Sequence, residues 1–197
     1  MVIIMKLNLP NKLTVLRVIM IPLFMVFLIF PIFGENVSRI VAAALFALTA
    51  FTDFLDGNIA RKYNLITDFG KFLDPLADKL MVFGALLAII VHNRADDTFV
   101  TVFVWAAFII MLRELAVTSL RLIVSSGEKI VIAANWLGKI KTVTQIACIL
   151  TVLLEPVITG KPCGVVSYIL IAAMTVMTLW SGINYFVAYL PHINPDK

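Results

Sequence analysis

The sequence has few cysteines, histidines and charged residues for a chain of 197 residues. Cys148 lies inside an apolar run and Cys163 in a loop, so a structural disulfide is not expected. His92 is expected far from the acidic residues described below, and His192 lies in the C-terminal tail, so neither is expected to be catalytic. Charged residues make up 14% of the chain and hydrophobic residues 61%, with a mean hydropathy of +1.02. A soluble core could not hide this much apolar surface, so lipid is the expected solvent and residues 1–197 are expected to form a single membrane domain.

The alternation of apolar and polar residues that membrane-barrel strands need is also missing. Six apolar stretches are instead long enough, or nearly so, to cross roughly 30 Å of hydrocarbon as helices. They cover residues 15–33, 38–60, 72–91, 98–124, 142–159 and 164–190. Residues 8–12 are expected to form a short interfacial segment in which Pro10 opens a helix. The predicted fold is therefore all-α: a polytopic membrane protein with six transmembrane helices and a short N-terminal interfacial segment.

Basic residues are unevenly distributed between the two sides of this topology. If the N-terminus is cytoplasmic, the outer side has only Arg39, Arg94 and Lys161. The inner side then has all the others, namely Lys6, Lys12, Arg17, Arg61, Lys62, Lys71, Lys79, Arg113, Arg121, Lys129, Lys139, Lys141 and Lys197. This asymmetry predicts that both termini are cytoplasmic. The net charge of +4 does not point to nucleic acid as a partner, since basic residues in membrane proteins first report topology and contact with anionic lipid.

Five aspartates lie within one short stretch, DFLDGNIARKYNLITDFGKFLDPLAD, at residues 53–78. Asp53, Asp56, Asp74 and Asp78 fall where apolar helices are expected, and carboxylates inside a membrane are costly and mark functional sites. The first pair is three residues apart and the second four, so each pair shares one helix face. The short loop at residues 62–69 predicts that the two helices are antiparallel neighbours. The four carboxylates are therefore expected to converge near the cytoplasmic helix ends.

Four carboxylates around one small volume need positive charge beside them, because mutual repulsion would otherwise keep some of them protonated. A pair of divalent cations would supply this charge, and oxygen ligands suit Mg²⁺ or Mn²⁺ rather than zinc. Two such metals are a known clamp for displacement at phosphorus. Gly57 and Gly70 would allow a bulky ligand to approach the backbone, and the guanidinium of Arg61 suits phosphate.

A structural role for the aspartates is the alternative. They could cap helix ends or pair with Arg61, Lys71 and Lys79. For four of them on two converging faces, the cost of burying charge argues against this alternative. Asp68 differs from the four, because it lies in the loop and is expected to be solvated or to cap the next helix.

The complete pattern is Asp-x2-Asp-Gly-x2-Ala-Arg-x8-Gly-x3-Asp-x3-Asp, from Asp53 to Asp78. It resembles the signature of the CDP-alcohol phosphatidyltransferase family at all eight fixed positions, without a gap or substitution. Within that family, further stretches resemble members that transfer a phosphatidyl group from CDP-diacylglycerol to sn-glycerol 3-phosphate. These stretches are LPNKLTVLR at 9–17, RELAVTSLR at 113–121 and LGKIKT at 137–142. Ser119 stands where many relatives have glycine, a departure that we do not interpret as a change of substrate.

The resemblance implies a homodimeric enzyme of the bacterial inner (cytoplasmic) membrane that uses two divalent cations, Mg²⁺ or Mn²⁺. It implies that Asp53, Asp56 and Asp74 hold one metal, that Asp53, Asp74 and Asp78 hold the other, and that Asp78 is also the general base. The CDP-lipid nucleotide would be bound by Asp56, Gly57, Ala60, Arg61 and Gly70. Asn11 and Thr14, one helical turn apart, are further candidates for nucleotide contact, with a role as interfacial or capping residues as the alternative.

The acceptor phosphate needs a cationic pocket of its own. Arg113 and Arg121 are eight residues apart, about two helical turns, so both face one way. Arg113 is deep enough in its span to need a partner, and the adjacent Glu114 points about 100° away around the helix. We therefore predict that Arg113, Arg121 and Lys139 bind glycerol 3-phosphate, with Gly138 permitting its close approach. Contact with lipid headgroups is the alternative for Lys129 and Lys141, while Arg17 could reach the interface or the substrate.

The predicted reaction gives phosphatidylglycerophosphate and CMP by direct displacement, because no Ser, Cys or His stands out as a covalent nucleophile. A carboxylate intermediate stays open. Within the family, the acceptor could instead be phosphatidylglycerol, serine or inositol phosphate, but an uncharged acceptor would leave the basic residues of the fourth and fifth spans unexplained. A divalent-cation transporter is the alternative from another class. The absence of a clear internal repeat and the phosphate-suited Arg61 argue against it.

Overall fold

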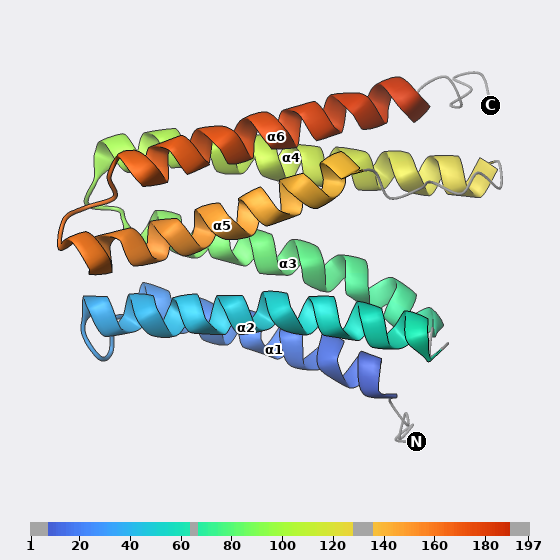
Figure 1. Cartoon of the computed structure of the whole chain (residues 1–197), viewed down its shortest axis with the longest axis horizontal. Helices are drawn as coiled ribbons and strands as arrows, with labels where there is room; N and C mark the ends of the chain where they lie inside the picture. Colours follow the sequence, from blue (N-terminus) through green and yellow to red (C-terminus); the bar gives the residue numbers. More distant parts are fainter. Residues whose placement is uncertain (1–7, 64–66, 128–135, 190–197) are drawn as a thin grey trace.

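A computed structural model describes residues 8–63, 67–127 and 136–189, without the side chains of residues 56, 58, 60–62 and 125–127. The described residues form the helices α1 (Leu9–Ile29), α2 (Glu35–Lys62), α3 (Asp68–His92), α4 (Asp97–Gly127), α5 (Trp136–Thr159) and α6 (Val165–Tyr189). They run alongside one another (Figure 1), and all six are long and apolar enough to cross a membrane. The predicted all-α, polytopic fold is confirmed, and the chain is a multi-pass membrane protein.

The first helix begins earlier than the apolar pattern predicts. Asn8 is its N-cap and accepts a hydrogen bond from the backbone N–H of Asn11 at 3.1 Å, while Pro10 lies in the first turn. This combination of a side-chain cap and an early proline starts the helix at Leu9. The prediction that Pro10 opens a helix is therefore confirmed, and residues 9–12 are continuous with the rest of α1. The interfacial location of residues 8–12 stays a prediction. Residues 1–7 lie outside the described part of the chain.

The helices pack in a closed ring in the order α1, α2, α5, α6, α4, α3 and back to α1. Figure 1 shows α1 and α2 on one side of the bundle, α4 to α6 on the other, and α3 between them. The sequence predicts that α2 and α3 are direct neighbours because their connection is short. In the structure both pack mainly on α1, and their contact with each other is slight. The connection restricts where the two helices meet, but side-chain packing decides which helix lies between them.

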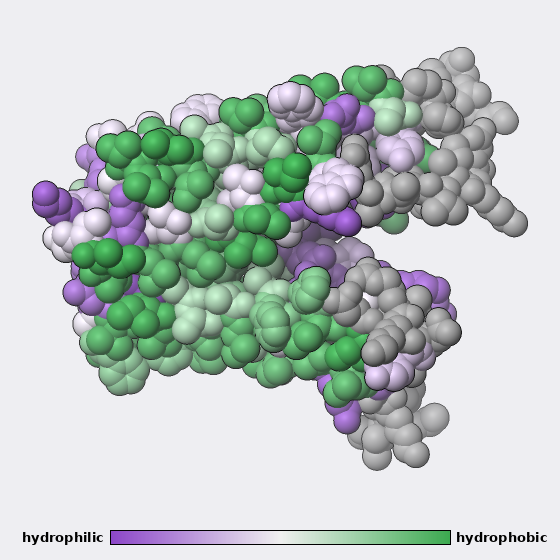
Figure 2. Space-filling model, in the orientation of Figure 1, coloured by the Kyte–Doolittle hydropathy of each residue, from purple (hydrophilic) through white to green (hydrophobic). Residues whose placement is uncertain are grey.

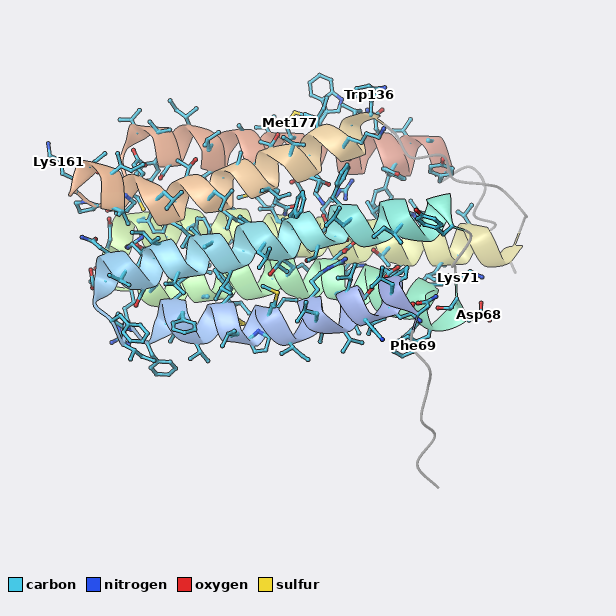
Figure 3. All side chains as sticks on the ribbon, turned by 60° about the horizontal axis from the view of Figure 1, so that its bottom comes forward. Asp68, Phe69, Lys71, Trp136, Lys161 and Met177 are labelled. Atoms are coloured by element: carbon cyan, nitrogen blue, oxygen red, sulfur yellow. The ribbon has the colours of Figure 1, made fainter. Side chains whose placement is uncertain are left out.

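The two ends of the bundle differ in charge. We call the half in which α1, α3 and α5 begin, and α2, α4 and α6 end, the aspartate half. The three basic residues predicted on the outer side, Arg39, Arg94 and Lys161, belong to the other half. Figure 3 shows Lys161 at one end of the molecule and Asp68 and Lys71 at the other. His92 also ends α3 in the half away from the aspartates, as predicted.

The half away from the aspartates contains most of the packed apolar core. Its fully buried side chains include Leu28, Phe46, Ile89, Phe103 and Leu153. Cys148, within this core, and Cys163, in the α5–α6 connection, are both free. Close packing at this end holds the helices together, while the aspartate half contains the polar cavity described below.

Candidate active site

A cavity of about 350 Å³ lies in the aspartate half between α2, α3, α4 and α5. Figure 2 shows a hollow with hydrophilic residues that interrupts the apolar surface at this end of the bundle. Carboxylates from α2 and α3 line one side of the cavity, namely Asp53, Asp74 and Asp78. Cations from α4 and α5 line the other side, namely Arg113, Arg121 and Lys141, with Glu114 among them, and Lys79 of α3 also belongs to the lining. The cavity therefore places negative and positive groups face to face.

Arg17 of α1 lies between the carboxylates of α2 and α3. Its Nη1 is 2.6 Å from Oδ1 of Asp53 and 2.7 Å from Oδ1 of Asp78. The side chain is 0% exposed, so it does not reach the membrane interface. Sequence spacing could not predict this contact, because Arg17 is more than thirty residues from either aspartate. The convergence of Asp53 and Asp78, which the sequence predicts, therefore takes place around a cation from a third helix.

The beginning of α1 is hydrogen-bonded to the beginning of α3. Thr67 is the N-cap of α3 and accepts a hydrogen bond from the backbone N–H of Gly70 at 3.0 Å. Asn11 Nδ2 donates to Thr67 Oγ1 at 3.0 Å, and Thr14 Oγ1 donates to Asp74 Oδ1 at 2.8 Å. These contacts hold Asp74 in place and give Asn11 and Thr14 a positioning role, while their predicted contact with the nucleotide stays a prediction.

Gly70 is buried at this junction of α1 and α3. A Cβ atom there would lie 3.0 Å from Asn11 Oδ1 and 3.3 Å from Thr67 Oγ1. The close neighbour is thus the Asn11 side chain, whereas the sequence predicts the approach of a ligand. Gly57 is half-buried in α2 and does not belong to the described lining of the cavity. The side chains of Asp56, Ala60 and Arg61 lie outside the described residues.

The donor set of the cavity fits a hard divalent cation. The carboxylates offer oxygen ligands only, which suits Mg²⁺ or Mn²⁺. Two of them already converge on one positive group, the Arg17 guanidinium. Among the side chains that the structure describes, no three ligand residues form a ready-made metal cluster, and the fourth predicted ligand, Asp56, is outside that set. The aspartates therefore fit a divalent metal, because they offer oxygen ligands and their carboxylates point toward one region. In the structure Arg17 pairs with Asp53 and Asp78, and Thr14 donates to Asp74.

The arginines of α4 are held against α6. The guanidinium carbons of Arg113 and Arg121 lie 5.8 and 5.7 Å from the centre of the Tyr185 ring, a cation–π arrangement. Arg113 Nη2 donates to Ser181 Oγ at 2.6 Å, and Arg121 Nη2 donates to Tyr185 Oη at 3.3 Å. Both arginines line the same cavity, so the prediction that they face one way is confirmed. The place of Tyr185 beneath both cations was not predicted from the sequence.

The lysines of α5 differ from the prediction, which placed Lys139 and not Lys141 in the acceptor site. Lys139 is exposed, and its Nζ lies 5.3 Å from the centre of the Trp136 ring, outside the described lining of the cavity. Lys141 is 7% exposed, lines the cavity and forms an ion pair with Glu114. Contact with lipid headgroups, the alternative for Lys141, is therefore wrong. The ion pair shows that the face of α5 with Lys141 points toward Glu114 of α4 and the cavity. A binding role for Lys139 stays a prediction.

The fold and the site together define a class: a polytopic membrane protein whose helices enclose a polar cavity with carboxylates on one side and cations on the other. The model of the CDP-alcohol phosphatidyltransferase family matches residues 7–180. Because this match covers most of the chain, the protein belongs to the CDP-alcohol phosphatidyltransferase family.

Similar curated proteins from several bacteria have related names. A CDP-diacylglycerol–glycerol-3-phosphate 3-phosphatidyltransferase of Bacillus subtilis (strain 168) is 40% identical, over 91% of this chain and 93% of the relative. A protein of the same name from Escherichia coli (strain K12) is 35% identical, over 93% of this chain and 96% of the relative. A probable phosphatidylglycerophosphate synthase of Mycobacterium tuberculosis (strain ATCC 25618 / H37Rv) is 36% identical, over 94% of this chain and 83% of the relative.

Proposed function

We propose that this protein transfers the phosphatidyl group of CDP-diacylglycerol to sn-glycerol 3-phosphate and releases CMP. The observation that carries the proposal is the single cavity in which Asp53, Asp74 and Asp78 face Arg113, Arg121 and Lys141. The carboxylate side suits a cation-bound diphosphate, and the cationic side suits the phosphate of a second substrate. The relatives' names agree with this pair of substrates.

The lipid substrate is proposed to enter sideways from the inner leaflet of the bacterial cytoplasmic membrane. The aspartate half would then face the cytoplasm, consistent with the location of most basic residues. Exposed apolar side chains of α2 and α3 in this half, including Phe54, Phe72 and Leu76, suit contact with acyl chains. The headgroup could thus enter the polar cavity while the acyl chains stay in lipid.

Asp53, Asp56, Asp74 and Asp78 are proposed to hold two divalent cations, Mg²⁺ or Mn²⁺. When bound, such cations neutralise negative charge on a diphosphate during displacement at phosphorus. Arg17 and Thr14 keep the carboxylates of Asp53, Asp78 and Asp74 directed toward one region. Proposed nucleotide contacts come from Asp56, Gly57, Ala60, Arg61 and Gly70, with Asn11 and Thr14 beside them.

Asp78 is proposed as the general base. Its side chain is 53% exposed and lines the cavity, and Arg17 holds its Oδ1, which fixes the carboxylate direction. It would take the proton of the primary hydroxyl of glycerol 3-phosphate. The oxygen of that hydroxyl would then attack the phosphorus that bears diacylglycerol, and the bond from that phosphorus to CMP would break. The products are phosphatidylglycerophosphate and CMP, formed without a covalent enzyme intermediate.

Arg113, Arg121 and Lys141 are proposed to bind the acceptor phosphate. Tyr185, Ser181 and Glu114 hold these cations in place, which reduces the entropy lost when the phosphate binds. The exposed Lys139 could attract the phosphate toward the cavity.

The first experiment is CMP release by the purified protein with CDP-diacylglycerol and Mg²⁺ or Mn²⁺. The acceptors compared are glycerol 3-phosphate, glycerol, serine, inositol phosphate and phosphatidylglycerol. We expect CMP release with glycerol 3-phosphate and with none of the other acceptors. Release with a different acceptor would overturn the assignment of the cationic side. Metal flux into sealed vesicles, without CMP release from any acceptor, would favour a transporter.

Removal of divalent metal is expected to abolish CMP release, because without metal the three lining aspartates would repel the diphosphate. Addition of excess Mg²⁺ or Mn²⁺ after the chelator should restore the initial rate. Full activity in the chelator, with metal content verified by elemental analysis, would contradict the assignment of the aspartates as metal ligands.

Gly182 of α6 provides a prediction about the acceptor side. A Cβ atom at Gly182 would lie 2.8 Å from Cγ of Arg113, so Gly182→Ala must displace the arginine. We expect a rise of roughly tenfold in KM for glycerol 3-phosphate, since a misplacement of about 1 Å can cost up to a hundredfold. The KM for CDP-diacylglycerol should change much less. Ile183→Ala is the control, because Ile183 is the next residue of α6, is 62% exposed and lies outside the described lining of the cavity. Equal kinetics of the two variants would show that Arg113 does not need its present position.

We further propose that residues 1–197 act as one domain and that the chain forms a homodimer, as the family resemblance implies. Cross-linking in native membranes, followed by electrophoresis, should reveal a species of twice the 21.8 kDa chain mass.

A further inference from the structure

Gln145 of α5 has an unsatisfied polar group at the cavity. Its side chain is 2% exposed and belongs to the cavity lining. The amide Nε2 is buried, and no group in the described part of the chain accepts a hydrogen bond from it. Gln145 lies four residues after Lys141, so both side chains are on the same face of α5. The amide therefore lies one turn further along the helix than the cation that pairs with Glu114.

A buried amide without a partner is costly, so its presence calls for an explanation. Leaving a buried donor unpaired reduces stability unless a ligand supplies the missing acceptor. The residue is neutral, whereas the groups assigned to the acceptor phosphate, Arg113, Arg121 and Lys141, are cations. A neutral donor is suited to an uncharged oxygen. Glycerol 3-phosphate has one such oxygen that is neither the nucleophile nor part of the phosphate, the secondary hydroxyl at C2.

We propose that Gln145 donates a hydrogen bond from Nε2 to the C2 hydroxyl oxygen of the acceptor and so selects acceptors that have this hydroxyl. The proposal rests on the proposed function, because it names a contact to glycerol 3-phosphate in the same cavity. A site built to bind a hydroxyl group discriminates against an analogue without it, since the protein group is then left unpaired. Gln145 is thereby a specificity residue that contacts substrate, distinct from the cations and from the base.

The test combines two proteins with two acceptors. Wild type and Gln145→Met are assayed for CMP release with glycerol 3-phosphate and with 3-hydroxypropyl phosphate, which lacks the C2 hydroxyl. For wild type we expect kcat/KM to favour glycerol 3-phosphate by roughly ten- to a hundredfold, the effect of one unpaired buried donor. In Gln145→Met the preference should fall close to one, because activity with glycerol 3-phosphate decreases while activity with the analogue stays.

Two further variants complete the test. Gln145→Leu also removes the amide donors without adding a charge, so it should lose the preference as well, even if Gln145→Met folds poorly. Thr144→Val should retain the wild-type preference. Thr144 is next to Gln145, but its Oγ1 donates to the Ile140 carbonyl and it lies outside the described cavity lining.

The outcomes separate the two proposals. An equal loss with both acceptors in the Gln145 variants would show a purely structural role, and the absence of any preference in wild type would show that the hydroxyl is not recognised. Either result overturns the assignment of Gln145 while wild-type turnover of glycerol 3-phosphate still supports the proposed function. No turnover by wild type with glycerol 3-phosphate would overturn both.

Discussion

Replacing Asp78 with asparagine is expected to stop turnover while CDP-diacylglycerol still binds. A general base contributes roughly a hundred- to ten-thousandfold in rate, so CMP release should fall by that factor. Asparagine has nearly the same shape and keeps an oxygen that can accept from Arg17, which is 2.7 Å from the carboxylate. The fold and the lipid site should therefore persist. The measurements are the CMP release rate and equilibrium binding of radiolabelled CDP-diacylglycerol in detergent.

Asp68→Asn is the matched control for this prediction. Asp68 is exposed, begins α3 and pairs only with Lys71 at 3.0 Å among the contacts described, so its loss should leave the rate unchanged. Full activity of Asp78→Asn would remove Asp78 from the role of base. Loss of CDP-diacylglycerol binding together with turnover would show that the role of Asp78 as a metal ligand, and not its role as the base, accounts for the lost activity.

Arg113→Ala is expected to impair the use of glycerol 3-phosphate more than the binding of CDP-diacylglycerol. A charged hydrogen bond contributes about 1.5–3 kcal/mol, which corresponds to a loss of roughly ten- to a hundredfold in kcat/KM for the acceptor. The arginine lies on the cationic side of the cavity, held by Ser181 and the Tyr185 ring, and has no contact with the aspartates among the described interactions. Initial rates with each substrate varied in turn provide the comparison.

The control for Arg113 is Arg94→Ala, because Arg94 is an exposed arginine in the opposite half of the bundle. It should leave both substrates' kinetics unchanged. If Arg113→Ala reduces use of both substrates equally, the arginine supports the structure by joining α4 to α6. A larger effect on the lipid substrate would reverse the assignment of the two sides of the cavity.

The membrane fold could be predicted from the sequence because its physical causes are local. A span requires about 20 apolar residues in succession, and this property can be read along the chain without knowledge of any neighbour. The pairing of Asp53 with Asp56 and of Asp74 with Asp78 on helix faces follows likewise from the 3.6-residue repeat. The beginnings of α1 and α5 were less predictable, because a cap, as at Asn8, or a segment with basic residues, as at Lys139 and Lys141, can extend a helix beyond its apolar stretch.

The roles of individual cations depended on packing between helices distant in sequence. Lys139 and Lys141 are equivalent in the linear pattern, yet only Lys141 faces Glu114 and the cavity, because α5 lies between α2 and α6. The place of Arg17 depends in the same way on α1 packing against both α2 and α3. Helical periodicity determines which residues share a face but not which direction that face points.

Residue order alone was therefore enough to predict a six-helix membrane protein with an acidic site, since hydrophobic length and helical spacing act within single segments. Only the packed bundle showed that Arg17 joins Asp53 to Asp78, that Tyr185 lies beneath two arginines, and that the Gln145 amide is buried without a partner in the described residues. The first two are contacts between helices far apart in sequence, and the third depends on which helices surround Gln145. Their energies depend on distances between side chains, and those distances exist only after the helices have packed.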